Sequence, residues 1–151
     1  MPQSLSKVYV HIVFSTKNRF PFLNDASIRK EMHAYLGGTL NEIECPVLAV
    51  GGTSDHVHIL CTLSKNHSLA DVIGKVKRSS SKWVKEKGRS VNKFAWQIGY
   101  GAFSVSQSGI EKVCQYIQQQ EEHHRRKTFQ DEFRSFLNLY QIQYDERYVW
   151  D

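Results

Sequence analysis

Two histidines separated by a single residue are the side chains of this sequence best suited to hold a metal ion. His56 and His58 lie in the run Asp55-His56-Val57-His58-Ile59-Leu60. Side chains two positions apart on a strand point to the same face, so both imidazoles can bind one divalent cation. The pair alone is a weak signal, because the chain has 7 histidines and two polar residues often share an exposed sheet face.

A tyrosine and a glutamine four residues apart add a second pair of reactive groups. Tyr116 and Gln120 follow a stretch with helical spacing. At about 100° per residue they lie roughly 40° apart around a helix axis, so they share one edge. A tyrosine beside a base or a cation can act as a nucleophile, and an amide oxygen suits Mg²⁺ or Mn²⁺. The alternative is a tyrosine half-buried beside a core stripe.

Together these groups match what phosphodiester cleavage requires. In-line displacement at phosphorus builds charge on the attacking and leaving oxygens, and a divalent cation stabilises that charge. Two imidazoles and one amide oxygen leave coordination positions open for substrate. A phosphate stored on a tyrosine keeps its bond energy, so a strand could later be rejoined without ATP. The sequence therefore indicates cleavage and rejoining of a nucleic acid.

The charge distribution favours a polyanionic partner. The formal net charge is +5, and basic residues cluster in three segments. If the three segments converge on one site, they form a track for a phosphate backbone. The alternative for each is the solvated face of an amphipathic helix. The candidate nucleic-acid contacts are Lys17, Arg19, Lys75, Lys77, Arg78, Lys82, Arg125 and Arg126.

The elements that must position these side chains follow the order β-α-β-β-α-β and then two helices. The spacing predicts strands at 7–14, 46–50 and 56–63 and a β-prone stretch at 94–105. It also predicts one helix capped by Asn24 or Asp25, one capped by Ser68, and two that start at about Ile110 and Phe129. We expect one α+β domain over residues 1–151, with the ferredoxin-like or RRM-like split β-α-β sheet. In that sheet both crossover helices cover one face, which leaves His56 and His58 on the open face.

The composition indicates the cellular compartment in which the protein works. Cys45, Cys61 and Cys114 are an odd set without a C-x-x-C pair, each in an apolar context, which favours buried reduced thiols in the cytoplasm. No run approaches the roughly 18 apolar residues of a membrane span, and the first residues do not resemble a secretory signal. We expect a cytoplasmic protein that needs no membrane and no small-molecule cofactor.

At this point three segments resemble the single-tyrosine HUH transposases of the insertion-sequence 200/605 type. His11-Ile12-Val13-Phe14 is similar to the family's first strand, Asp55 to Leu60 to its histidine strand, and Tyr116-Ile117-Gln118-Gln119-Gln120 to its tyrosine helix. The resemblance implies a metal-dependent endonuclease and strand transferase for single-stranded DNA. It implies that His56, His58 and Gln120 hold Mg²⁺ or Mn²⁺ while Tyr116 forms a 5′-phosphotyrosine link. It also implies a homodimer that binds DNA hairpins, with sites completed in cis or in trans.

Other functions remain open at the level of sequence. A non-catalytic nucleic-acid-binding module would need the basic segments but neither the histidine pair nor Y-x-x-x-Q. A host protein that processes repeated palindromes would carry the same motifs as a transposase. A metalloenzyme acting on small molecules would leave the lysine cluster without a use. The segment 129–151 has no role assigned by the resemblance; it could brace a dimer or touch DNA.

Overall fold

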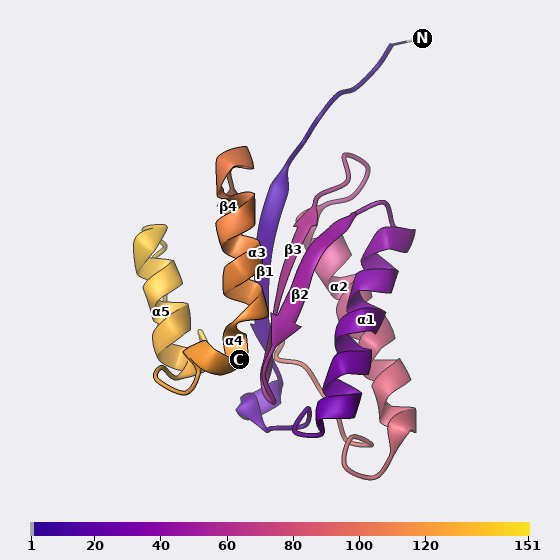
Figure 1. The fold of residues 1–151 in the computed structure, drawn as a ribbon, viewed down its shortest axis with the longest axis vertical. Coiled ribbons are helices and arrows are strands. Elements are labelled where there is room, and N and C mark those ends of the chain that lie inside the picture. The colour runs from indigo at the N-terminus through magenta and orange to yellow at the C-terminus, as the bar shows by residue number, and fades with distance from the viewer. Residues whose placement is uncertain (1) are drawn as a thin grey trace.

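The computed structural model describes residues 2–151 and contains one four-stranded antiparallel sheet (Figure 1). Its strands, in the spatial order β2-β3-β1-β4, are β1 (Tyr9–Ser15), β2 (Val47–Gly52), β3 (His56–Thr62) and β4 (Gly101–Val105). The two central strands are β1 and β3, and they pair from Tyr9↔Thr62 to Ser15↔His56. This topology confirms the ferredoxin-like sheet expected from the sequence.

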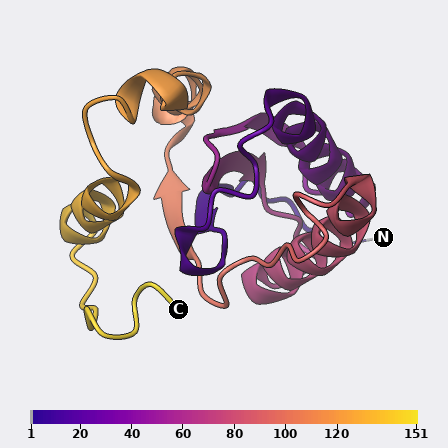
Figure 2. The same cartoon turned by 90° about the horizontal axis from the view of Figure 1, so that it is seen from below.

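Helices cover both faces of the sheet. On one face lie α1 (Ala26–Glu42) and α2 (Leu69–Val84), the two crossover helices. On the other side lie α3 (Ile110–Gln118), the short α4 (Gln120–His123) and α5 (Phe129–Leu139) (Figure 1). Figure 2 shows α5 and the segment after it on the outer side of β4. Short 3₁₀ turns occur at Lys17–Arg19, Lys85–Lys87 and Gln107–Gly109.

Local sequence signals explain where the helices begin. The Asp25 carboxylate accepts hydrogen bonds from the backbone N–H groups of Ser27 and Ile28 and so caps α1. The Ser68 hydroxyl caps α2 by accepting a hydrogen bond from the backbone N–H of Asp71. The starts of α1, α2, α3 and α5 therefore agree with the sequence prediction. Among the described residues, no helix combines the length and the apolar character that crossing a membrane requires.

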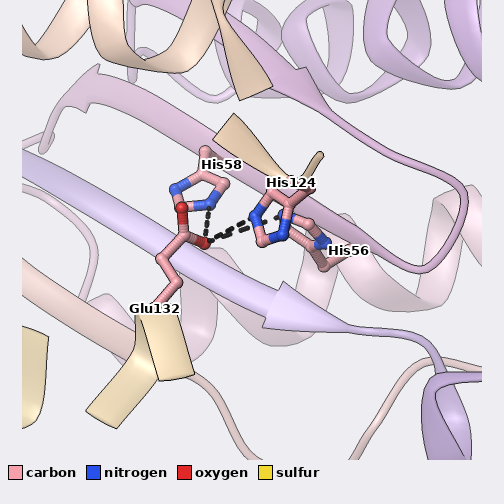
Figure 3. Close-up of side chains that lie close together, drawn as sticks. All are labelled: His56, His58, His124 and Glu132. Atoms are coloured by element: carbon pink, nitrogen blue, oxygen red, sulfur yellow. Dashed lines mark hydrogen bonds and ion pairs between the residues drawn. The ribbon is translucent and has the colours of Figure 1, made fainter. Parts of the chain in front are cut away.

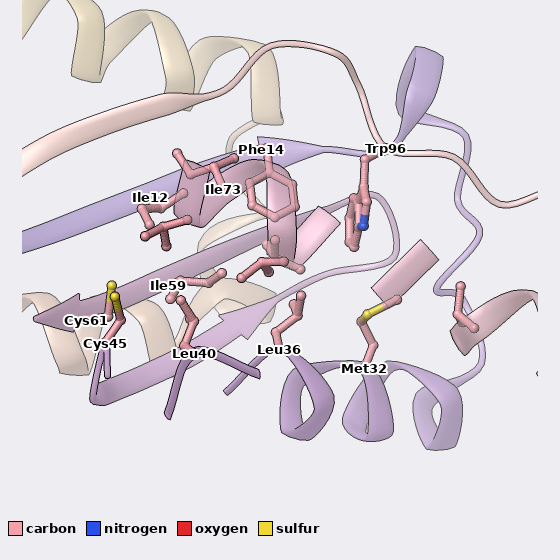
Figure 4. Close-up of a cluster of buried hydrophobic side chains, with 14 of the residues drawn as sticks. Ile12, Phe14, Met32, Leu36, Leu40, Cys45, Ile59, Cys61, Ile73 and Trp96 are labelled. Carbon is pink, nitrogen blue, oxygen red and sulfur yellow. The ribbon is translucent and has the colours of Figure 1, made fainter. Parts of the chain in front are cut away.

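The main core lies between the sheet and the two crossover helices. Because strand side chains alternate, Val57 and Ile59 of β3 point into this core. Of the three free cysteines, Cys45 and Cys61 are buried there, whereas Cys114, which we expected to be buried as well, is half-exposed. Figure 4 shows the centre of this core, which includes Ile12, Phe14, Met32, Leu36, Leu40, Cys45, Ile59, Cys61, Ile73 and Trp96.

A second apolar cluster fixes α5 to the opposite face of the sheet. Phe129 and Phe133 of α5 pack with Val13 of β1 and Phe103 of β4. The close approach depends on Gly101, because a Cβ atom at this position would lie 2.4 Å from Cε2 of Phe133. A glycine at the start of a strand here allows another segment to come close.

The stretch 94–105 differs from a continuous strand. Only Gly101–Val105 forms β4, while Trp96 makes an isolated bridge with Thr16. The segment in between bends away because the Lys77 ammonium donates to the carbonyl oxygens of Gln97, Ile98 and Gly99 at 2.8, 3.2 and 2.6 Å. These contacts compete with strand pairing and hold the bend.

Candidate active site

The histidine pair lies on the face of β3 opposite the crossover helices. We expected this face to be open, but the C-terminal helices cover it. His56 and His58 are fully buried, with 0% of each residue exposed to solvent. The Nδ1 atom of His56 lies 2.8 Å from a carboxylate oxygen of Asp55 and 3.0 Å from the Thr53 hydroxyl. Asp55 can only accept, so Nδ1 carries the proton and Nε2 keeps its lone pair directed into the site.

The ring of His58 is oriented by a further histidine, His11. Nδ1 of His58 lies 2.8 Å from Nε2 of His11, which is buried on the same face of β1. The two strands place them diagonally, because His58 pairs with Val13 and His11 with Leu60. This contact fixes the His58 ring and turns its own Nε2 toward the same point as His56.

Gln120 completes a set of converging oxygen and nitrogen atoms. Its amide nitrogen lies 3.2 Å from Oε2 of Glu132, so the donor end of the amide is used there. Its Oε1 atom therefore faces Nε2 of His56 at 3.0 Å. Two acceptors at this separation repel each other unless a cation or a proton lies between them. The donor chemistry therefore fits the metal ion that the sequence predicts.

Tyr116 lies beside this set and is joined to it by one carboxylate. The phenol of Tyr116 donates a hydrogen bond to Oε2 of Glu132. The Oε1 atom of the same carboxylate lies 2.9 Å from Nε2 of His58 and 3.2 Å from Nε2 of His124. Figure 3 shows His56, His58, His124 and Glu132 directed at one point, with potential ligand atoms within 4.8 Å of one another.

Burial and mutual contacts set the charge state of the cluster. Burial lowers the pKa of His58 to about 4 and that of His11 to about 3, so both imidazoles are neutral at pH 7. Burial raises the pKa of Glu132, but contacts with His124 and His58 outweigh it and hold that pKa far below its usual range. Burial and the Glu132 charge both raise the pKa of Tyr116. Neutral imidazoles beside an ionised carboxylate form a donor set suited to a divalent cation.

Tyr116 is reached from solvent through a cleft of about 610 Å³. Its walls combine the nucleophile candidate with two basic residues, which suit an anionic substrate, and with two carboxylates. The lining residues are Tyr116, Glu122, His123, Arg126, Lys127 and Glu132.

The family model described as "Transposase IS200 like" matches residues 4–120 of this chain, which include both histidines and the Y-x-x-x-Q segment. The chain belongs to this family. The match ends at Gln120, so Glu132 and helix α5 lie beyond the part that defines an IS200-like transposase.

Two solved structures share the fold of this IS200-like transposase. A transposase candidate from Deinococcus radiodurans R1 is 21% identical with a TM-score of 0.62, and the match covers 80% of this chain and 95% of that one. A REP-associated tyrosine transposase bound to a REP hairpin is 11% identical with a TM-score of 0.56, covering 79% and 70%. No curated protein sequence matches the chain significantly.

The structure brings together the four residues expected at the centre, His56, His58, Tyr116 and Gln120, within one chain (Figure 3 for the histidines). The sequence motifs did not include His124, and sequence reasoning missed Glu132 altogether. Nothing in the sequence marked Glu132 as a site residue, because it lies in an ordinary amphipathic helix among other charged residues. Its role follows only from where α5 docks.

The basic segments do not converge on one site. Arg126 lines the Tyr116 cleft, and Arg125 lines a neighbouring cleft of about 550 Å³. In contrast, α2 lies on the other face of the sheet, where Lys77, Arg78 and Lys82 border a separate cleft of about 720 Å³. The three basic segments cannot form one track, because the apolar stripe of α2 fixes this crossover helix to the core face of the sheet.

Two of the candidate DNA contacts, Lys77 and Arg19, have partners inside the protein. The Lys77 ammonium is taken up by three backbone carbonyls, and burial lowers the pKa of Lys77 to about 8. The Arg19 guanidinium lies 5.7 Å from the ring centre of Trp150 in the C-terminal segment. Lys17 and Lys75 are exposed.

The buried imidazoles predict a loss of stability in acid. In the unfolded chain His58 takes up a proton near pH 6.5, whereas in the folded chain it stays neutral until about pH 4. Acidification through this window therefore favours the unfolded chain, by about 3 kcal/mol for His58 alone at pH 4. Urea unfolding of metal-free protein, repeated from pH 7 to pH 4, should show this decline. A His58→Gln variant should show a shallower one, and a flat profile for the parent chain would contradict the buried neutral imidazole.

Proposed function

We propose that this IS200-like transposase is a metal-dependent endonuclease and strand transferase for single-stranded DNA. The observation that supports this most directly is that the Tyr116 hydroxyl lies in one cluster with Nε2 of His56 and His58. A tyrosine hydroxyl and two oriented imidazoles in one cluster have no purpose in a binding module. The whole of residues 1–151 would act as one domain.

In the proposed reaction His56, His58 and Gln120 would hold Mg²⁺ or Mn²⁺, which would supply Lewis-acid stabilisation of the charge that develops at the scissile phosphate. The Tyr116 oxygen attacks phosphorus as the bond to the 3′ oxygen breaks. The phenolic proton is lost and the 3′ oxygen gains one, which leaves a 5′-phosphotyrosine link and a free 3′-hydroxyl. Attack of a 3′-hydroxyl on that link reforms a phosphodiester and returns the phenol, so strand transfer needs no ATP.

The DNA is proposed to be single-stranded with hairpins. Support comes from the structural neighbour bound to a REP hairpin and from the basic wall of the Tyr116 cleft. Arg125 and Arg126 would contact the backbone near the scissile phosphate. The other proposed contacts, on the first turn and on α2, are Lys17, Arg19, Lys75, Arg78 and Lys82. Lys77, expected from the sequence as a contact, is not proposed again because its ammonium is bound by three backbone carbonyls. A homodimer and a cytoplasmic location stay predictions, testable by light scattering and by fractionation.

A host-serving role in processing repeated palindromes is a second candidate, favoured by the REP-associated neighbour. Both candidates use the same chemistry and differ in substrate. Oligonucleotides that carry the host's repeated palindromes, assayed beside the ends of any flanking element, would separate them.

Metal removal tests the proposed chemistry. A labelled single-stranded hairpin oligonucleotide should be cut by the purified protein with Mn²⁺ or Mg²⁺ and left intact when a chelator is added. Activity should return when either ion is restored, because the charge that develops at phosphorus needs the cation. Cleavage at an undiminished rate in the chelator would rule out the role given to His56 and His58.

A further inference from the structure

The most unusual group in the site is a carboxylate from outside the family segment. Glu132 belongs to α5, beyond the matched residues 4–120, and it is 3% exposed. Within residues 2–151, the side chains that pair with its carboxylate are those of Tyr116, Gln120 and three histidines, and none is a lysine or an arginine. A buried carboxylate without a fixed cationic partner is costly to keep.

The two oxygens of Glu132 face different partners. Oε1 lies 2.9 Å from Nε2 of His58 and 3.8 Å from Nε2 of His56, on the side where the inward nitrogens meet. Oε2 accepts from the Tyr116 phenol and from the Gln120 amide. One carboxylate therefore connects the candidate metal ligands to the candidate nucleophile.

The docking of α5 fixes this carboxylate in place. Phe129 and Phe136 stand three residues before and four residues after Glu132, so they lie on its side of the helix, and Phe133 is the next residue along. Phe129 and Phe133 belong to the cluster that anchors α5 to the sheet, and Phe136 contacts it. The Phe136 ring also meets the rings of His58 and Tyr116, at centroid distances of 6.3 and 5.8 Å. A carboxylate held in this way is preorganised rather than a chance contact.

We propose that Glu132 is a direct ligand of the metal through Oε1 and holds the Tyr116 phenol beside that metal through Oε2, so that α5 completes the active site from the same chain. This inference rests on the proposed function and deepens it. It adds an anionic ligand to the neutral set of His56, His58 and Gln120. Three imidazoles in reach and one carboxylate also favour Mn²⁺ over Mg²⁺, since imidazole nitrogen suits transition metals better.

The test is metal binding by a Glu132→Gln variant, with Asp131→Asn as the matched control. Glutamine keeps the shape and removes the charge, while Asp131 is the exposed neighbour on the same helix and pairs with Arg134. We expect Mn²⁺ affinity, measured by calorimetry and by electron paramagnetic resonance, to fall at least about tenfold in Glu132→Gln and to stay unchanged in Asp131→Asn. Water-proton relaxation should report one more water on the bound Mn²⁺.

A second variant guards against a merely structural effect. Glu132→Asp keeps the charge but withdraws the carboxylate by one methylene, so it should fold as Glu132→Gln does and bind Mn²⁺ with intermediate affinity. Circular dichroism and thermal unfolding of the metal-free proteins provide the check on folding.

The outcomes separate this inference from the proposed function. Equal Mn²⁺ affinity and equal hydration in the parent chain and Glu132→Gln would overturn the ligand role, while Tyr116-dependent cleavage would still stand. Tighter binding or faster cleavage in Glu132→Gln would overturn it too, and would mark the carboxylate as an obstruction. If the parent chain binds no Mn²⁺ at all, both the metal in the proposed function and the ligand role fail.

Discussion

Replacing Tyr116 with phenylalanine should abolish covalent capture of single-stranded DNA and lower cleavage by roughly 10⁴-fold or more. The substitution removes only the hydroxyl that donates to Glu132. The ring keeps its edge contacts with His58 and Phe136, whose centroids lie 5.7 and 5.8 Å away. The metal ligands are untouched, so the loss would report the nucleophile itself.

The capture assay needs a label on the correct fragment. A 5′-phosphotyrosine link leaves the protein on the fragment that lies 3′ of the cut, so the oligonucleotide carries its label at the 3′ end. Tyr9→Phe is the matched control, because the Tyr9 hydroxyl bonds only to Gln107 at an exposed position. Continued formation of the adduct by Tyr116→Phe would assign the nucleophile to another residue.

Removing either imidazole of the central pair should weaken Mn²⁺ binding by at least about 100-fold. Loss of groups that merely orient a ligand already weakens binding 10- to 100-fold, and His56 and His58 direct their own nitrogens at the site. The stabilisation that a bound ion gives the folded chain, about 2.7 kcal/mol at 100 times its dissociation constant, should vanish in parallel. Thermal unfolding of His56→Gln and His58→Gln with and without Mn²⁺ measures both effects.

The control for this experiment is an unrelated histidine. His67 lies in the turn after β3, at the far end of that strand from His56, and His67→Gln should respond to Mn²⁺ as the parent chain does. If His56→Gln or His58→Gln keeps the stabilisation by Mn²⁺, the ion binds elsewhere and the proposed metal centre is wrong.

Much of the fold could be predicted because local signals and long-range packing agree in it. The alternation in β3 placed Val57 and Ile59 in the core and His56 and His58 on the opposite face, as the structure has them. Capping by Asp25 and Ser68 set the helix starts, which are local events that depend on a few backbone groups. The family motifs then selected the residues at the centre of the site.

The part that sequence could not give depends on tertiary docking. Glu132 belongs to no motif, and the first-strand motif that includes His11 gave this residue no role. Their contacts arise because α5 packs on β4 and because β1 lies next to β3. Gly51 is a second example. A Cβ atom at this position would lie 2.3 Å from the carbonyl oxygen of Ile117. Because glycine has no Cβ atom, α3 can bring Tyr116 close to the strands. A glycine in sequence does not reveal which segment approaches it.

The docking of α5 also has a consequence for the timing of synthesis. The four strands are complete once the ribosome has made Val105, but Tyr116 and Glu132 come later in the chain. Domains begin to fold from their N-terminal side during translation. A nascent chain can therefore assemble its sheet and both oriented imidazoles while it still lacks a nucleophile. Cutting of DNA by this chain should therefore begin only after Tyr116 has been made and α5 has docked on the sheet.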